Sequence, residues 1–272
     1  MLKLVNAQRS TTLLFLAAAL TLTGCKPDTA TRQGEVIDKG TGPATPASAP
    51  VSSGTPVDPL TAGGIKGTVH FKGTAPARIK IDMSMDPACA MSAADNLTEQ
   101  YIVSGDKLAN VYVYIKSGVA PSMETASATP AVLDQKGCRY TPHVIALQQG
   151  GTVVFKNSDP TMHNIHITPP TESGAIDISQ GPMGQPQTQQ FNSPQVMLPV
   201  RCNHHPWMNA FINVAPSPYF AVTGADGSFT ITGLPPGTYT LAAVHEKLGE
   251  QDVQVTVPAK STSKADFTFT AK

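Results

Sequence analysis

Four residues near the middle of the chain have the types and spacing of a metal site. Cys202, His205 and Met208 lie three residues apart, and His163 follows a stretch that alternates like a strand. One tight loop between two strands can aim three side chains so spaced at one ion, while the fourth must come from the end of a neighbouring strand. A thiolate and two imidazoles in a plane, with a weak axial thioether, are the ligands of a blue-copper centre. The spacing therefore predicts one type 1 copper ion held by these residues.

Other ligands and another metal stay open at this point. His204 stands beside His205, and His166 alternates with His163 along a strand, so both are possible ligands. We favour His205, because with His204 the gap between the cysteine and the histidine would be a single residue. Zinc is the main rival metal, since it also takes cysteine and histidine. A thioether is a poor zinc ligand, so Met208 favours copper.

Two longer strings surround these residues: residues 150–164 are GGTVVFKNSDPTMHN and residues 202–208 are CNHHPWM. They resemble the corresponding strings of cupredoxins, the family of plastocyanin and azurin, over roughly residues 131–216. The resemblance implies a Greek-key β-sandwich in which Asn164 hydrogen-bonds across the site and holds the two ligand loops together. Pro206 and Trp207 are expected to wall the site off from water and so to tune its reduction potential.

The N-terminus has the pattern of an exported protein with a lipid anchor. Two basic residues precede an apolar run, 13–22, that is too short to span a membrane. The run ends in Leu-Thr-Gly-Cys25, which resembles the lipobox of bacterial lipoproteins, and the next residue, Lys26, resembles the pattern sent on to the outer membrane. We predict a signal peptide over 1–24, and a lipidated Cys25 with a flexible linker over 25–62.

The chain has four cysteines, and their number limits which of them can form a disulfide. If Cys25 is lipidated, three cysteines remain in an oxidising compartment, and one of them must be unpaired. With Cys202 as a metal ligand, Cys89 and Cys138 are predicted to form a disulfide. The alternative, in which Cys138 is the ligand and Cys202 is bridged, would leave the neighbouring histidine and methionine without their thiolate.

The elements that must position these residues are strands. Alternation predicts strands over Ile65–Phe71 and Val111–Ile115, and Thr223–Leu241 contains an Asp-Gly turn, a strand, a Pro-Pro-Gly turn and another strand. This last string is similar to the carboxypeptidase regulatory-like (transthyretin-like) β-sandwich. We therefore predict an all-β fold, a Greek-key cupredoxin-like β-sandwich plus a carboxypeptidase regulatory-like β-sandwich, divided into first strands over 63–118, a copper domain over 119–216 (core 131–216) and the second β unit over 217–272.

Composition excludes some functions and leaves others. With 19 basic and 19 acidic residues and no basic cluster, nucleic-acid binding is not expected. The chain has no glycine-rich phosphate loop, HExxH or GxSxG motif, so we expect no enzyme. His70, His143 and His245 are expected to be structural. The predicted function is one-electron transfer to an unidentified protein partner by a lipid-anchored, periplasm-facing copper protein of the cell envelope. The alternatives are a lipoprotein that holds or delivers copper, and an envelope scaffold whose sandwich binds a partner.

Overall fold

The computed structural model describes residues 58–92, 96–119, 126–168 and 174–271. The predicted signal peptide, Cys25 and the linker up to residue 57 lie outside them. Strands dominate the described residues, whose one helix, α1 (Pro87–Ser92), lies in the stretch around Cys89. No helix among these residues has the length and apolar character needed to cross a membrane. The all-β prediction is confirmed.

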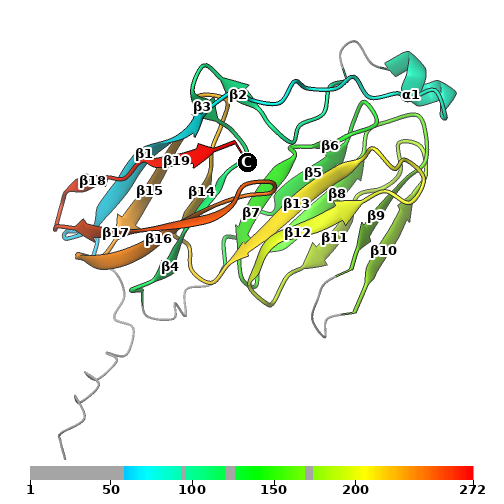
Figure 1. The fold of residues 1–272 in the computed structure, drawn as a ribbon. Helices are drawn as coiled ribbons and strands as arrows, with labels where there is room; N and C mark the ends of the chain where they lie inside the picture. The colour runs from blue at the N-terminus through cyan, green and yellow to red at the C-terminus, as the bar shows by residue number, and fades with distance from the viewer. Residues whose placement is uncertain (1–57, 93–95, 120–125, 169–173, 272) are drawn as a thin grey trace, which may run out of the picture. The chain divides into compact units, whose positions relative to one another are not determined.

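The first sandwich combines strands from both sides of the middle segment (Figure 1). Its strands are β1 (Gly63–Lys72), β2 (Val103–Ser104), β3 (Lys107–Leu108), β4 (Tyr112–Ser117), β14 (Phe220–Val222), β15 (Ser228–Leu234), β16 (Gly237–His245), β17 (Gly249–Val257), β18 (Thr262–Lys264) and β19 (Phe267–Thr270). One sheet has the order β15-β1-β3-β2, with β18 and β19 also paired to β1, and the other has the order β14-β4-β16-β17. The two early strands β1 and β4 thus pair with strands from beyond residue 219.

Alternation explains how β1 fits this sandwich. Ile65, Val69 and Phe71 are buried in its core, on the face that the two-residue period predicts. Gly67 shares that face, and a Cβ there would lie 1.6 Å from the carbonyl oxygen of Ala265. Only glycine therefore permits this close approach of the two backbones.

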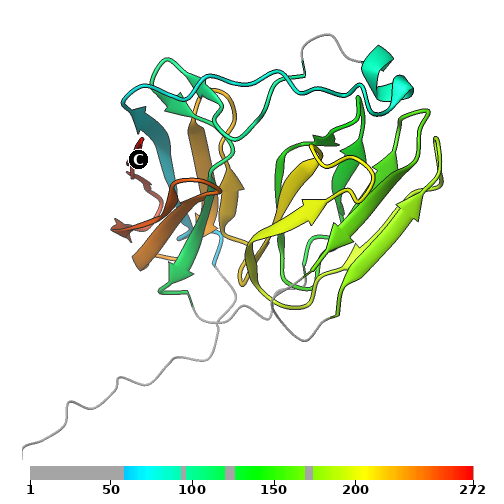
Figure 2. The same ribbon diagram turned by 45° about the vertical axis from the view of Figure 1, so that its right-hand side comes forward.

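The second sandwich is built from consecutive strands, green to yellow in Figure 2. They are β5 (Ala131–Gln135), β6 (Tyr140–Thr141), β7 (Val144–Gln148), β8 (Thr152–Asn157), β9 (His163–Ile167), β10 (Ile176–Gln180), β11 (Gln187–Gln190), β12 (Gln195–Arg201) and β13 (Asn209–Ala215). One sheet has the order β10-β9-β12-β13-β7 and the other β11-β8-β5-β6. Leu133 and Phe155 from one sheet and Ile165 and Ile212 from the other are fully buried in a shared core.

The chain changes sheets between β7 and β8. The turn between them falls at Gly150 and Gly151. The two strands do not pair with each other, because β7 joins β13 and β8 lies between β11 and β5. The turn is therefore a crossing between the layers and not a hairpin.

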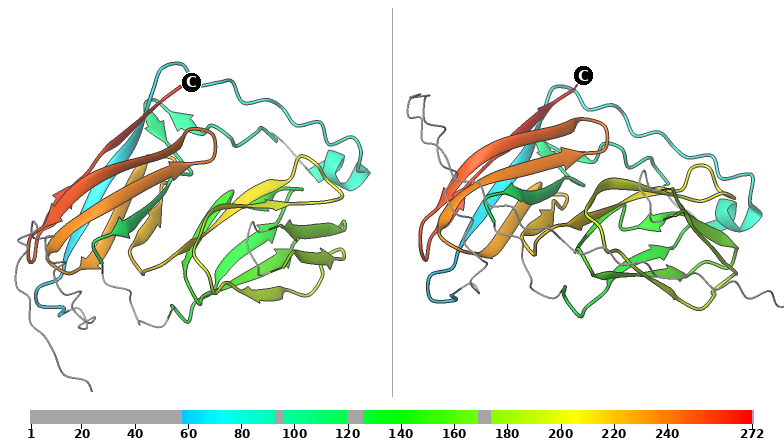
Figure 3. Two further views of the ribbon diagram at one scale, coloured as in Figure 1. Left: turned by 60° about the horizontal axis from the view of Figure 1, so that its bottom comes forward. Right: turned by 90° about the horizontal axis from the view of Figure 1, so that it is seen from below.

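A long segment between β1 and β2 carries α1 (cyan in Figure 3). Among its described residues, an isolated bridge joins Lys80 to Leu97. A disulfide between Cys89 in α1 and Cys138, in the turn between β5 and β6, ties the segment to the second sandwich. The disulfide that cysteine parity predicts is thus present.

Candidate metal centre

A hairpin loop carries three of the four predicted ligands. β12 and β13 pair antiparallel up to Arg201 and Asn209, which leaves residues 202–208 as the loop between them. Two backbone hydrogen bonds close it: the Met208 N–H donates to the His205 carbonyl at 2.9 Å, and the Cys202 N–H donates to the Met208 carbonyl at 3.4 Å. The loop is thereby folded on itself.

The fourth predicted ligand comes from the strand beside this loop. β9 pairs antiparallel with β12 at His166 and Arg201, so the first residue of β9, His163, lies alongside the loop. The side chains of His163, Cys202 and His205 are all buried, and one potential ligand atom of each lies within 4.8 Å of the other two. The structure thus brings together two imidazoles and a thiol from separate elements.

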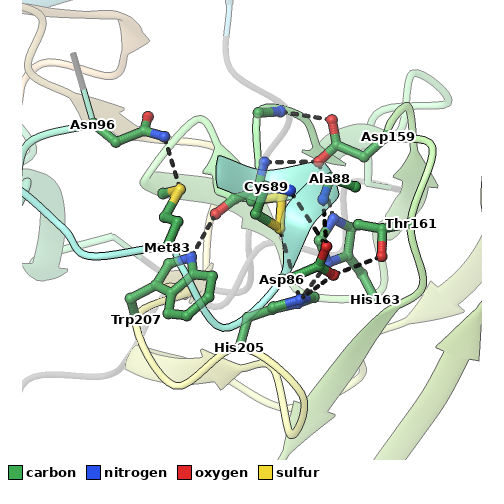
Figure 4. Close-up of a disulfide and its surroundings, with 12 residues drawn as sticks. Met83, Asp86, Ala88, Cys89, Asn96, Asp159, Thr161, His163, His205 and Trp207 are labelled. Atoms are coloured by element: carbon green, nitrogen blue, oxygen red, sulfur yellow. Dashed lines mark hydrogen bonds and ion pairs between the residues drawn. A yellow bond between two sulfur atoms is a disulfide. The ribbon is translucent and has the colours of Figure 1, made fainter. Parts of the chain in front are cut away.

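The two imidazoles present the same nitrogen to each other. Their Nδ1 atoms are 3.0 Å apart, and Nδ1 of His205 is 3.6 Å from the Cys202 sulfur. Each Nε2 faces a carboxylate instead: His163 is 2.9 Å from Asp159, and His205 is 3.0 Å from Asp86 (Figure 4). An ionised carboxylate can only accept, so each Nε2 carries a hydrogen, and a ring that is neutral turns its Nδ1 lone pair toward the other ring.

The electrostatics of the two carboxylates support this assignment. The hydrogen bond from the Thr161 hydroxyl, ahead of that from His205, lowers the pKa of Asp86 to about 2. Burial raises the pKa of Asp159, but hydrogen bonds from His163 and from the N–H groups of Cys138 and Gly137 outweigh it, and the pKa is lowered. Both groups are therefore ionised at neutral pH.

The pKa values of the three inner groups also depart from their ordinary values. Burial lowers the pKa of His163, but the hydrogen bond to Asp159 and the contact with Cys202 outweigh it, so that the pKa is raised. Burial raises the pKa of the Cys202 thiol, yet its bonds with His163 and backbone N–H groups lower it overall. The pKa of His205 is lowered, chiefly by burial. Cys202 is thus favoured as a thiolate, the form that binds metals.

These donors fit a soft or borderline cation. When both rings are neutral, the thiolate and the two imidazole lone pairs face one another and would stabilise a cation among them, and sulfur with imidazole suits copper and zinc. Histidine ligands that donate their other N–H to a carboxylate are the usual arrangement around protein metals. The donor set itself carries the fit.

Met208 and Trp207 lie at the end of the 202–208 loop. Met208 is buried, 2% exposed, in the core of the second sandwich. The indole of Trp207 lies 5.1 Å from the imidazole of His205, centroid to centroid, and its Nε1 donates to the Cys138 carbonyl at 3.1 Å. Trp207 therefore covers one side of His205. Pro206 is exposed and lines, with these two residues, a cavity of about 240 Å³.

Asn164 links the two ligand-bearing segments. Its side-chain oxygen accepts a hydrogen bond from the Asn203 N–H at 3.4 Å, and its amide donates to Asp177 at 2.6 Å. The hydroxyl of Tyr140 also donates to the Asn164 carbonyl. The start of β9 is thus fastened to the 202–208 loop on one side and to β10 on the other.

The other candidate histidines lie elsewhere. His204 is exposed, with its ring centroid 6.5 Å from that of His205, and His166 contacts Thr168 and Asp177. Within the described ranges neither joins the cluster of Cys202 and the two buried imidazoles. The geometry therefore selects His205 over His204.

The remaining histidines have other partners. His70 lies beside Asp106 at 2.7 Å, and His143 beside Glu246 at 2.6 Å. His245 is buried in the first sandwich, with the ring of Tyr101 5.8 Å away.

Sequence reasoning missed the residues that orient the imidazoles. Asp159 stands four residues before His163, inside the string 150–164. This spacing could have indicated that Asp159 contacts the histidine. Asp86 is 119 residues from His205, and Thr161 donates to it at 2.8 Å. The sequence signal for Asp86 was its place three residues before Cys89, because the predicted disulfide brings Cys89 close to Cys138.

Comparisons with known proteins find one family model and a set of solved structures. The family model, the carboxypeptidase regulatory-like domain, matches residues 203–270, which include β13 of the second sandwich and the strands from β14 to β19 of the first. The solved structures similar to the chain include amicyanins and a Cu-containing nitrite reductase. No curated protein matches the chain.

Three of these solved structures serve as examples. A mutant of amicyanin with Cu(I) is 19% identical, with 38% of this chain and 97% of that chain covered and a TM-score of 0.29. Amicyanin from Paracoccus versutus is 19% identical, with 38% and 96% covered and a TM-score of 0.29. A Cu-containing nitrite reductase from Thermus scotoductus SA-01 is 19% identical, with 50% and 27% covered and a TM-score of 0.29.

Proposed function

We propose that this chain is a type 1 copper protein that transfers single electrons. The proposal rests on one observation: the Cys202 sulfur and the Nδ1 atoms of His163 and His205 lie close together in the protein interior. The Nε2 atom of each ring is hydrogen-bonded to a carboxylate. Three electron-rich donors so placed are satisfied by one cation.

The residues divide the work of such a centre among them. Copper, when bound, supplies a one-electron change between Cu(I) and Cu(II). Cys202 would provide the path for the electron, and Cys202, His163, His205 and Met208 would hold the metal. β9, the closed 202–208 loop and the two carboxylates hold the thiol and the two imidazoles, so these donors would need to move little between the two oxidation states.

The test is the optical and EPR spectrum of the full chain with one equivalent of Cu(II). An intense visible thiolate-to-copper band with narrow copper hyperfine splitting is expected, and Cys202→Ala should abolish the band. His205→Gln should abolish or shift it strongly. His204→Gln is the matched control, because the neighbouring ring is exposed, and it should leave the spectrum unchanged. A wild-type spectrum without the charge-transfer band would refute the type 1 assignment.

Copper delivery is the second candidate, and exposed thioethers favour it. Met85, next to Asp86, is 74% exposed, and Met162, next to His163, is 46% exposed. Met183 is 66% exposed, and its N–H donates to the Asp159 carbonyl. Thioethers suit Cu(I), and exposed methionines are unusual on a soluble surface. Reversible reduction without loss of copper to a chelator supports electron transfer, whereas rapid exchange to the chelator supports delivery.

We also propose that the protein is located in the cell envelope, where a lipid on Cys25 anchors it to the outer membrane and the folded part faces the periplasm. The support is the lipobox-like string and the apolar run before it. Expression of the full chain with labelled fatty acid should label the wild type and place it in the membrane fraction. Cys25→Ser should remove the label and release the protein, and unchanged fractionation of the unlabelled variant would refute the anchor.

A further inference from the structure

Asp86 reaches the centre from outside both ligand-bearing segments. One carboxylate oxygen faces Nε2 of His205 at 3.0 Å and accepts from the Thr161 hydroxyl at 2.8 Å. The other accepts from the N–H groups of Ala88 and Cys89, at 2.7 and 3.4 Å. Asp86 is thus the N-cap of α1, and the same side chain that starts the helix orients the imidazole.

The Cys89–Cys138 disulfide connects the two orienting carboxylates. Cys89 lies in the first turn of α1 and donates to Asp86, while the N–H groups of Cys138 and Gly137 donate to Asp159, both at 2.7 Å (Figure 4). A continuous path therefore runs from one imidazole to the other through Asp159, the disulfide and Asp86. Two further groups of potential ligands, each containing one of these cysteines, trace this path; their cysteines are bonded to each other and so are not thiolates.

The two ends of this path differ in their dependence on the disulfide. Asp159 is held by the turn between β5 and β6, within the same sandwich as His163. Asp86 lies on the segment between β1 and β2, and the disulfide is the covalent tie between α1 and the sandwich that holds His205. Loss of the tie should therefore loosen the His205 side of the site and spare the His163 side.

We infer that Asp86 is a positioning residue, clamped by the Cys89–Cys138 disulfide, which fixes the His205 imidazole with Nδ1 turned toward Cys202 and His163. This inference rests on the proposed copper function for its consequence, which is retention of the metal. Opening the clamp takes two electrons and two protons from a dithiol, which becomes a disulfide while Cys89 and Cys138 become thiols. The opened protein exchanges its copper faster.

The first experiment reads the tautomer of His205 in the metal-free full chain by nitrogen NMR of the labelled imidazoles. The wild type should show hydrogen on Nε2, and Asp86→Asn should give a mixture of tautomers or the reverse one. Asp82→Asn is the matched control, since Asp82 lies on the same segment and its carboxylate accepts from the Ser84 N–H instead. An unchanged His205 tautomer in Asp86→Asn would overturn the inference whatever the metal.

The second experiment measures copper affinity and exchange by competition with a chelator. Loss of such an orienting partner typically weakens metal binding by about 10- to 100-fold, and we expect that change for Asp86→Asn, a smaller one for Thr161→Val, and none for Asp82→Asn. Cys89→Ser with Cys138→Ser should raise the exchange rate in the same direction. If this double variant does not fold, the copper affinities of Asp86→Asn and Thr161→Val still test the positioning role of Asp86.

The outcomes separate the two proposals. A wild type that binds no copper refutes the proposed function, while the tautomer measurement still tests the role of Asp86. If the wild type binds copper and both Asp86→Asn and Asp82→Asn bind it with the same affinity, the positioning role of Asp86 is refuted and the proposed function is not.

Discussion

Acidification should destabilise the first sandwich through one buried histidine, His245. Its side chain is 2% exposed, its ring packs near those of Tyr101 and Phe269, and its Nδ1 accepts the Lys247 N–H at 3.2 Å. Burial lowers the pKa of His245 from 6.5 to about 4, although the charge of Glu246 acts in the opposite direction.

The sign follows from comparing proton uptake in the two states. Below pH 6.5 the unfolded chain binds a proton at this histidine and the folded chain does not, so stability falls as the pH falls from 6.5 to about 4, and levels off below. With these two pKa values the loss is about 2 kcal/mol at pH 5 and about 3 kcal/mol at pH 4. Above pH 7 the residue contributes no pH dependence.

The assay is urea unfolding of the metal-free full chain at pH 7, 5 and 4. Other groups titrate in this range too, so the quantity of interest is the difference between the wild type and His245→Asn, whose side-chain oxygen can still accept the Lys247 N–H. That difference should shift by about 3 kcal/mol between pH 7 and pH 4 in favour of the variant. Parallel profiles for the wild type and His245→Asn would refute the reasoning.

Three further substitutions test the packing. Gly67→Ala should cost about 3 kcal/mol or more in urea unfolding, because its Cβ would lie 1.6 Å from a backbone oxygen; Gly181→Ala, with open space around it, should be near neutral. Removing both Cys89 and Cys138 should cost about 4 kcal/mol, from the chain entropy of a 49-residue loop; equal midpoints for the variant and the wild type would contradict this. Asn157→Ala should cost about 2 to 4 kcal/mol and lower the melting temperature, because three backbone carbonyls lose their donor; an unchanged melting temperature would show that water replaces the amide.

Sequence could predict the strands and the ligand loop because both depend on local spacing. The two-residue period places Ile65, Val69 and Phe71 on one buried face, and the three-residue spacing from Cys202 to Met208 fits one hairpin loop. Cysteine parity predicted the disulfide without any geometry, once Cys25 was assigned to the lipid anchor and Cys202 to the metal site.

Pairing and long-range contacts could not be predicted in the same way. Alternation shows that 144–148 and 152–157 are strands, but it does not say that they belong to opposite layers. The choice between His204 and His205 needed the fold of the loop, which buries one ring and exposes the other. Asp86 and His205 are 119 residues apart in the sequence, and no periodic pattern predicts their contact.

The metal centre is therefore not a property of the second sandwich alone. Residues 126–216 contain all four predicted ligands, and they would supply Asp159 to orient His163, but they lack the carboxylate that orients His205. That group arrives on the segment that leaves β1 of the first sandwich, and the disulfide fixes it in place. Because an imidazole can bind a metal through either nitrogen, the orienting carboxylate decides which one is offered. The segment that leaves the first sandwich would thus contribute to the proposed copper site, which gives a physical reason for the two sandwiches to share one chain.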